Sequence, residues 1–323
     1  MRILGRALAW LGWAALTVAA VLGVALAALA VLATAPMTRP FVASRAVRFL
    51  DEAIAGSLVL KGVTVLPGGG IELRGLEVYD PHGHLVLSVG RARFFVDITG
   101  LRGRAVGVAI ELESPSVLLE EEEGGGVSIV RAFEPARRPA EAAPGKGRGG
   151  GGGSAWTIHV THVTIRNGDF WWVDHRGGTR LEASGLDLDG RGLVGPGLSR
   201  ADLRLRGALE VPVSGPLALE LAGGITGSAL RIPVLRAQVA GTELSAVADG
   251  DLSRIRGRVA VNRLGIARDV ARAFAPRTPP GDDLDGSAYA ESDGAVATLA
   301  VHAEPAGEAA RGRADAAVAA RVS

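Results

Sequence analysis

The chain has 323 residues, a net charge of +1 and no cysteine. The balanced charge shows no electrostatic footprint for nucleic acid, and the absence of thiols excludes disulfide bonds and thiolate metal sites. Glycine is abundant at 46 residues and aromatic side chains make up only 4%, a composition typical of many short strands joined by turns.

Residues 7–38 form the longest apolar segment, with no charged side chain between Arg6 and Arg39. About 20 apolar residues cross the hydrocarbon core of a bilayer, so this segment predicts a transmembrane helix. Arg2 and Arg6 precede the segment, which favours a cytoplasmic N-terminus. The apolar residues that we expect to form this anchor are Leu8, Leu11, Leu16, Val18, Val21, Leu22, Val24, Leu26, Leu29 and Val31.

A cleaved signal peptide is the alternative interpretation of this segment. Ala33-Thr34-Ala35 fits a small-x-small cleavage site. However, the apolar run is much longer than the central region of a signal peptide, and Pro36 directly after the site is a poor context for cleavage. We therefore favour an uncleaved anchor.

Residues 39–55 carry an approximate helical stripe of apolar side chains and predict a short helix, whose arginines could lie near lipid head groups or simply face solvent. From Ser57 the apolar period changes to two, which predicts strands. Turns are expected at Pro67–Gly70 and at Asp80–Gly83, where Asp-Pro is followed by glycine. Further strands are expected at Ala105–Leu112, Ser116–Glu120 and Val127–Val130.

Residues 134–154 combine proline, glycine and charge without apolar periodicity, so they predict a flexible linker or long loop. Strand patterning resumes at Trp156, Pro212 and Pro233 suggest strand edges or bulges, and residues 264–274 predict one or more helical turns. The predicted organisation is an anchor at 1–38, a first β module with a short leading helix at 39–133, the linker, and a second β module at 155–323.

The predicted strands present one apolar and one polar face over more than two hundred residues, with scarcely a helix to cover the apolar side. Such a sheet must pack on a second sheet or curl around an apolar ligand, and the pattern fits both. The clearest alternation supplies the candidate binding residues, which are Leu203, Leu205, Leu209, Val211, Val213, Leu217, Leu219 and Leu221.

The chain offers few residues for catalysis or metal binding. The candidate motifs are Glu120–Glu123, the pairs His82/His84 and His159/His162, Asp174-His175 beside Trp171-Trp172, and Gly145-Lys146-Gly147. None has the spacing of a zinc site, and the last lacks the flanking residues of a phosphate-binding loop. No nucleophile elbow of the G-x-S-x-G type is present. The sequence therefore predicts no enzyme, no catalytic residue, no metal and no cofactor.

Three segments carry a resemblance to a known family. They are GLEVYDPHG at residues 75–83 with the apolar strand through Asp97, SPSV at 114–117, and the block from Trp156 to Gly190 with its Asn-Gly-x-Phe turn. Together with the anchor, these segments resemble the AsmA/TamB-like envelope proteins, and specifically the N-terminal region of TamB. The resemblance is one of pattern and covers most of the chain up to about Phe274.

The resemblance implies an all-β fold in which a transmembrane helix precedes a long, curled, antiparallel-rich sheet that forms an apolar groove, with few short helices. It also implies a protein of the Gram-negative inner membrane with most of its chain in the periplasm. The expected role is phospholipid transport to the outer membrane, or assistance to outer-membrane β-barrel assembly with a TamA-like partner. No nucleic-acid partner is expected.

The chain departs from this family in length, because TamB-like chains are far longer and carry a C-terminal module that meets the outer-membrane partner. We expect about 16–18 strands here, at the usual strand spacing of about 4.8 Å. The chain is therefore expected to be a fragment, or a short member that works with a second protein.

Overall fold

The computed structural model describes residues 55–67, 70–97, 99–121, 127–133, 157–175, 178–195, 197–251, 253–254, 256–274, 283–293, 296–305 and 314–321. The chain divides into two compact units. The first unit comprises residues 1–153 and 168–180, and the second comprises residues 154–167 and 181–323. Strands make up most of the described chain, which confirms the predicted all-β class with few short helices.

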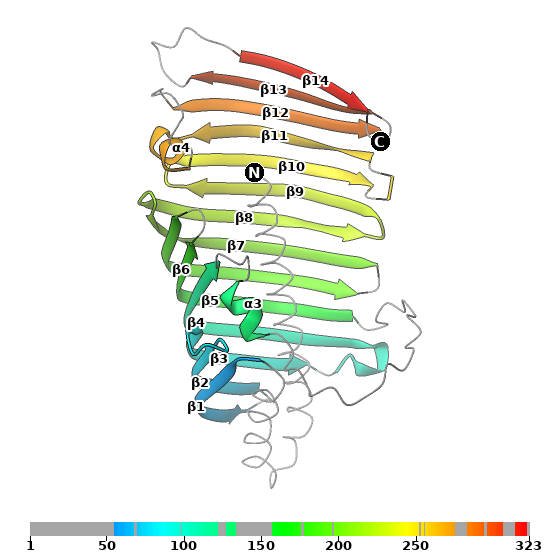
Figure 1. The fold of residues 1–323 in the computed structure, drawn as a ribbon. Coiled ribbons are helices and arrows are strands. Elements are labelled where there is room, and N and C mark those ends of the chain that lie inside the picture. Colours follow the sequence, from blue (N-terminus) through cyan, green and yellow to red (C-terminus); the bar gives the residue numbers. More distant parts are fainter. Residues whose placement is uncertain are drawn as a thin grey trace, which may run out of the picture. The chain divides into compact units, whose positions relative to one another are not determined.

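The first unit contains four complete strands that pair antiparallel in chain order (Figure 1). Its elements are β1 (Ser57–Leu66), β2 (Gly70–Tyr79), β3 (Leu85–Asp97), η1 (Leu101–Gly103), β4 (Ala105–Glu121) and α3 (Ser128–Ala132). The predicted Asp80–Gly83 turn joins β2 to β3. Its Asp80 carboxylate accepts the backbone N–H groups of His82 and His84, both at 2.9 Å.

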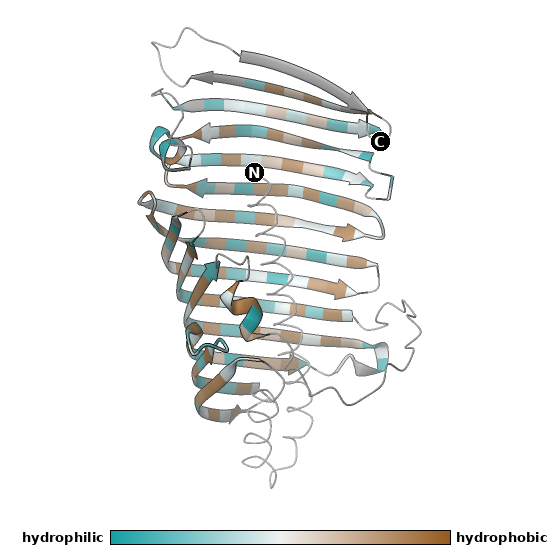
Figure 2. Cartoon of the chain, in the orientation of Figure 1, coloured by the Kyte–Doolittle hydropathy of each residue, from teal (hydrophilic) through white to brown (hydrophobic). Residues whose placement is uncertain are grey.

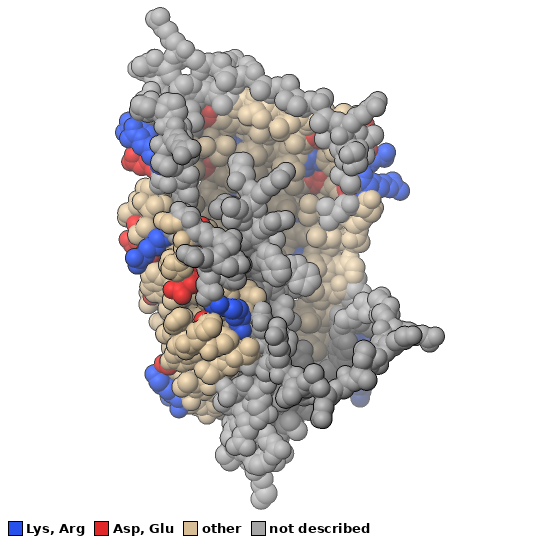
Figure 3. All heavy atoms as spheres, viewed as in Figure 1, with Lys and Arg blue, Asp and Glu red and all other residues tan. Residues whose placement is uncertain are grey.

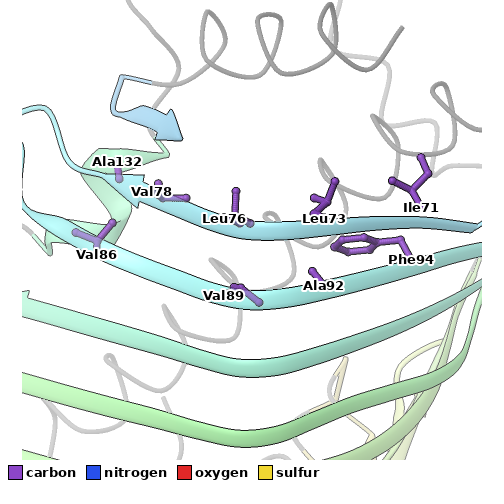
Figure 4. Close-up of a cluster of buried hydrophobic side chains, with 9 residues drawn as sticks. All are labelled: Ile71, Leu73, Leu76, Val78, Val86, Val89, Ala92, Phe94 and Ala132. Atoms are coloured by element: carbon purple, nitrogen blue, oxygen red, sulfur yellow. The ribbon is translucent and has the colours of Figure 1, made fainter. Parts of the chain in front are cut away.

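An apolar core lies on one face of this sheet (Figure 4). Its buried members are Ile71, Leu73, Leu76, Val78, Val86, Val89, Ala92, Phe94 and Ala132. Cross-strand pairing places Leu76 opposite Val89 and Ile71 opposite Phe94, so alternate residues of β2 and β3 meet on the same face. Ala132 of α3 is fully buried in this cluster, and α3 therefore covers part of the apolar face.

A row of three small residues, two of them with a left-handed backbone, crosses the sheet of the first unit. Gly75, Gly90 and Ser114 follow one another across β2, β3 and β4, and each lies between paired neighbours. Gly75 has φ 60° and Ser114 has φ 50°, left-handed values, although the strand register continues through both positions without a shift. Figure 4 shows the strands bending beside Leu76 and Val89, next to this row. The core-facing positions of β2 accordingly switch from odd to even numbers there.

The second unit is built from long strands, each antiparallel to the next in the chain from β6 onward. Its elements are β6 (Thr179–Gly195), β7 (Leu198–Val211), β8 (Gly215–Thr226), β9 (Ala229–Val239), β10 (Thr242–Asp251), β11 (Arg256–Ile266), α4 (Arg268–Phe274), β12 (Leu284–Asp293), β13 (Val296–Pro305) and β14 (Ala314–Arg321). The division between the units falls within β5 (Thr157–Asp174), after Asn167, and at the start of β6.

Pro212 and Pro233, which were predicted to mark strand edges or bulges, lie where their missing N–H groups are tolerated. Pro212 lies between β7 and β8, outside both strands. Pro233 lies inside β9, at a register shift towards both β8 and β10, so neither neighbour pairs with it. The predicted bulge at Pro233 is therefore confirmed.

Several predicted boundaries were wrong. The strands expected at Ala105–Leu112 and Ser116–Glu120 are one strand, β4, because the left-handed backbone at Ser114 does not interrupt its pairing with β3. The strand expected at Val127–Val130 is replaced by α3. Ser128 explains this change, because its hydroxyl accepts the backbone N–H of Glu120 at 3.0 Å and donates to the carbonyl of Leu118, which holds the segment against β4.

The helix expected at 264–274 begins only at Arg268, because residues 264–266 continue β11. Fourteen strands are present in the described part of the chain, against the 16–18 expected. The predicted anchor at 7–38, the short helix at 39–55 and the linker at 134–154 lie outside the described residues, apart from Ala55. None of the helices within the described ranges is both long and apolar enough to span a membrane.

Candidate functional site

One face of the sheet in the second unit is apolar from strand to strand. Residues that pair across neighbouring strands share a face, and the pairing from β6 to β13 brings aliphatic side chains into three adjacent rows. The first row contains Leu188, Leu205, Leu219, Ala237, Leu244 and Leu264. The second contains Leu203, Leu221, Leu235, Ala246, Val261, Ala288 and Val301, and the third contains Ala248, Val259, Ala290 and Leu299. We call these residues the leucine face.

Most side chains of the leucine face are only half-buried. Val259, Leu299 and Val301 are 46%, 44% and 38% exposed. Large contiguous apolar surfaces are uncommon on soluble monomers and usually mark a contact with a partner or ligand. Figure 3 shows a broad uncharged expanse on the described residues turned to the viewer, with most charged groups towards its margins.

No second layer of strands covers the leucine face within the described part of the second unit. Its strands form a single series of neighbours, and its one described helix, α4, has seven residues. A sandwich core made within this unit is therefore not found among the described residues. The leucine face has the hydrophobicity of a core with the exposure of a surface.

The opposite face of the same strands is charged, and its residues alternate with the leucine face along each strand (Figure 2). Arg204 and Arg236 approach the two carboxylate oxygens of Glu220 at 3.4 Å each, from the strands on either side. At one end of this ladder Asp189 pairs with Arg166 at 3.1 Å. We call this side the charged face, and its polarity suits contact with water.

The Asp249 carboxylate accepts a hydrogen bond from Arg258 at 2.6 Å on the charged face and raises the pKa of that guanidinium. Exposed pairs of this kind stabilise a protein only slightly. Their main effect here is to satisfy the charges that alternate with the leucines. The two faces therefore differ in chemistry along most of the described sheet.

Seven of the eight candidate binding residues predicted from the sequence lie in β7 or β8 at alternate positions of one face. Leu205 lies opposite Leu219, and Leu203 lies opposite Leu221. Leu209 is 2% exposed and is the most buried of the set. Val213 lies outside the strands, in the connection between β7 and β8.

The sequence prediction missed much of the same surface, because it named no candidate in β6 or in the strands after β8. Leu188, Leu235, Leu244 and Leu264 extend the leucine face in both directions. Apolar residues alternate with polar ones in these strands too. However, register shifts in β9 and β11 change whether odd-numbered or even-numbered residues lie on the leucine face. Following the numbering across such a bulge assigns residues to the wrong face.

The motifs considered for chemistry are dispersed. His82 and His84 lie in the β2–β3 turn with ring centroids 6.4 Å apart, His159 and His162 lie in β5, and Trp171, Trp172 and Asp174 lie near its end, with His175 just beyond. Glu120 and Glu121 end β4, whereas Glu122, Glu123 and Gly145-Lys146-Gly147 lie outside the described residues. Within the described ranges, no group of three or more His, Asp or Glu side chains is arranged to hold a metal ion.

Asp80 is the most buried acid of the first unit. Burial would raise the pKa of its carboxyl, but hydrogen bonds from the backbone N–H groups of His84 and His82 outweigh that effect, and the pKa is lowered. Its second oxygen lies 3.6 Å from Nη2 of Arg131 in α3 and 3.6 Å from Nδ1 of His84. Asp80 therefore connects the turn to the helix that covers the core, which is a structural role.

Glu72, on the outer side of the same sheet, has a side chain only 5% exposed among three arginines. Arg93 and Arg74 donate hydrogen bonds to its carboxylate at 2.9 and 2.6 Å and lower its pKa. Arg91 and Arg93 also reach Glu113 and Glu111, so three acids balance three bases. This cluster satisfies its own charges and offers no reactive group.

Comparison with known proteins found no matching family model and no matching curated protein. The leucine face is therefore the feature on which a function must be argued.

Proposed function

We propose that this chain is an AsmA/TamB-like envelope protein whose leucine face holds the acyl chains of phospholipids. The observation that carries the proposal is an apolar surface that runs from β6 to β13 and is not covered by any described layer of the second unit. The charged face behind it gives the same strands a side that suits water.

The dimensions of the surface support an acyl-chain ligand. The nine strands from β6 to β14, spaced by about 4.8 Å, extend over about 38 Å. Half of a bilayer hydrocarbon core is about 15 Å thick, so an acyl chain can lie fully within this length. Each methylene removed from water contributes about 0.8 kcal/mol, which a continuous apolar surface supplies without any catalytic residue.

In this proposal residues 7–38 anchor the chain in the inner membrane of a Gram-negative cell, with the N-terminus in the cytoplasm and both units in the periplasm. The partners are membrane phospholipids and, at the outer membrane, a TamA-like or other envelope protein. Curling of the sheet into a groove would enclose the lipid chains and belongs to the same proposal.

Lipid analysis of the region from about residue 40 to residue 323, purified without detergent, tests this function. We expect phospholipid at a fixed stoichiometry to the wild-type protein. Combining Leu205→Arg with Leu219→Glu places a complementary charge pair at opposed positions of the leucine face, so strand pairing is kept while the surface becomes polar. We expect this variant to retain less than about a tenth of the lipid.

Ala218→Glu is the matched control. Ala218 lies opposite Arg206 on the charged face. The substitution therefore creates the same kind of cross-strand charge pair at the position next to Leu205 and Leu219, but on the other side of the sheet. The control should keep its lipid, and far-ultraviolet circular dichroism should report strand in all three proteins. A folded wild-type protein without lipid, or equal lipid in all three, would contradict the proposal.

A scaffold for client strands is the second candidate, because β1 pairs only with β2 among the described strands. An unpaired strand edge can accept another strand by main-chain hydrogen bonding. A photo-crosslinker at Val59, which is 45% exposed, should then capture outer-membrane β-barrel precursors, while the purified protein carries no lipid. Lipid without crosslinks favours the acyl-chain role.

A further inference from the structure

The charged face of the second unit contains a depression of about 750 Å³ near the ends of β6, β7, β8 and β9. Three arginines, Arg191, Arg200 and Arg231, line it together with one aspartate, Asp202. The charged lining therefore sums to +2, from three positive groups and one negative group. Small residues, including Gly224, form much of the rest of the surface.

Arg200 and Arg231 lie on either side of Gly224 in the register of the sheet. Gly224 in β8 pairs with Arg200 in β7 and with Arg231 in β9, so the three residues occupy one row. The Cα atoms of the two arginines are separated by two strand spacings, about 10 Å. Because the residue between them has no side chain, two long guanidinium groups can approach a ligand above it from both sides.

Two nearby arginines of this face, Arg191 and Arg258, have acidic partners. Arg191 reaches Asp202 at 2.8 Å, and Arg258 binds Asp249, the residue that pairs with Arg231 in the sheet, at 2.6 Å. Within the described residues no carboxylate lies within ion-pair distance of Arg200 or Arg231. Both side chains are exposed and line the same depression, Arg200 from β7 and Arg231 from β9.

The space above Gly224 is maintained by the backbone. A Cβ at this position would overlap the carbonyl oxygen of Ser199 and lie 3.1 Å from the Cα of Arg200. Any larger residue would therefore force β7 and β8 apart. Strand pairing therefore requires glycine at position 224, which is also the position over which a ligand would lie between the two arginines.

We propose that Arg200 and Arg231 bind one phosphate group, as a monoester, a diester or the free ion, across Gly224. A guanidinium presents its N–H donors in a planar fork that matches two phosphate oxygens, and two such forks supply positive charge from both sides of the anion. This site lies on the face opposite the leucine face and does not depend on the acyl-chain proposal. The phosphate can come from a lipid head group or from a soluble compound.

Calorimetric titration of the full chain in a non-ionic detergent tests the site with two probes. Inorganic phosphate represents the soluble source, and glycerophosphoglycerol represents a phosphodiester head group without acyl chains. Arg200→Gln combined with Arg231→Gln should weaken binding of the better probe at least tenfold. Arg204→Gln combined with Arg206→Gln removes the same two charges from the same face outside the depression, and should leave affinity within about twofold.

Tighter binding of glycerophosphoglycerol assigns the site to a lipid head group, and tighter binding of inorganic phosphate assigns it to a soluble source. The proposal is overturned if neither probe binds the wild-type chain, or if both double variants lose affinity equally. Should the first double variant lose its strand signal, the single variants Arg200→Gln and Arg231→Gln replace it, and each should lose at least threefold. Lipid capture by the leucine face is measured separately, so either proposal can fail alone.

Discussion

The two units make their strands from the same alternation of apolar and polar residues, yet they bury their apolar faces to different extents. Ten aliphatic or aromatic residues of the first unit are buried, although it has only four complete strands. The second unit, with more than twice as many strands, buries only Ala183, Leu209, Ala246 and Val270 among its described apolar residues. Most of its other described leucines remain half-buried.

This difference shows that alternation specifies a two-sided sheet and leaves open what the apolar side contacts. In the first unit α3 packs on β3 and β4 and contributes the fully buried Ala132, so the apolar side is a core. In the second unit no described element does the same. An apolar face without a cover is available to a ligand, and this contrast can be tested by mutation.

Truncating one leucine in each unit should give the largest contrast. Leu76 is 6% exposed, and Leu76→Ala should destabilise the first unit by about 2–5 kcal/mol because it leaves an enclosed cavity. The same change at half-buried Leu219 should cost about 1 kcal/mol or less, since solvent can fill the space. Urea unfolding of lipid-free protein, followed by circular dichroism, measures both. Equal costs would show that the two faces are equally enclosed.

Replacing Asp80 should loosen the cover of the first unit. Asp80→Asn removes the charge beside Arg131 and weakens the turn, and we expect a loss of about 1–3 kcal/mol. Hydrogen exchange should rise in residues 128–132 and in the β2–β3 turn, whereas β7 and β8 should be unaffected. Unchanged exchange in α3 would contradict the role assigned to Asp80.

The same carboxyl predicts a dependence of stability on pH. Its pKa in the folded protein is lowered from its ordinary value of 3.8, so its stabilising contribution is present above pH 3.8 and is lost as the pH falls through the lower folded pKa. The wild-type first unit should therefore lose more stability than Asp80→Asn between pH 4 and pH 2. Parallel acid titrations of the two proteins measure the difference.

Two left-handed positions of the first unit, Gly75 and Ser114, should respond in opposite directions to two substitutions. Gly75→Ala forces a Cβ into a left-handed conformation and to within 2.5 Å of the flexible Lys61 side chain, which should cost about 1–2 kcal/mol. Ser114→Gly relieves the strain at φ 50° and should stabilise the unit by less than about 1 kcal/mol. Thermal melts resolve the sign, and destabilisation by Ser114→Gly would show that the serine side chain is needed.

The strands and the two-sided sheet were predictable from the sequence because alternation such as Leu203, Leu205 and Leu219, Leu221 follows directly from the pleat. The row at Gly75, Gly90 and Ser114 was not, because an isolated glycine or serine does not reveal which residues lie opposite it on the neighbouring strands. Register is a relation between strands, and it decides which residues reach the same face.

The helix α3 was missed for a related reason. Residues 127–130 are apolar enough for a strand. Only the contacts of the Ser128 hydroxyl with Glu120 and Leu118 of β4, eight and ten residues earlier in the chain, favour a helix. The paired arginines around Gly224 are equally invisible in the sequence, since Arg200 and Arg231 are separated by a hairpin.

The order of the strands in the second unit has a consequence for how it forms and how it can change. Each strand from β7 onward pairs with the strand just before it, so every added strand completes the previous edge. Such a sheet can assemble one strand at a time in the order of synthesis. Stability then sums over nearest neighbours, as in repeat proteins, and a hairpin could be gained or lost while the remaining pairs keep their register.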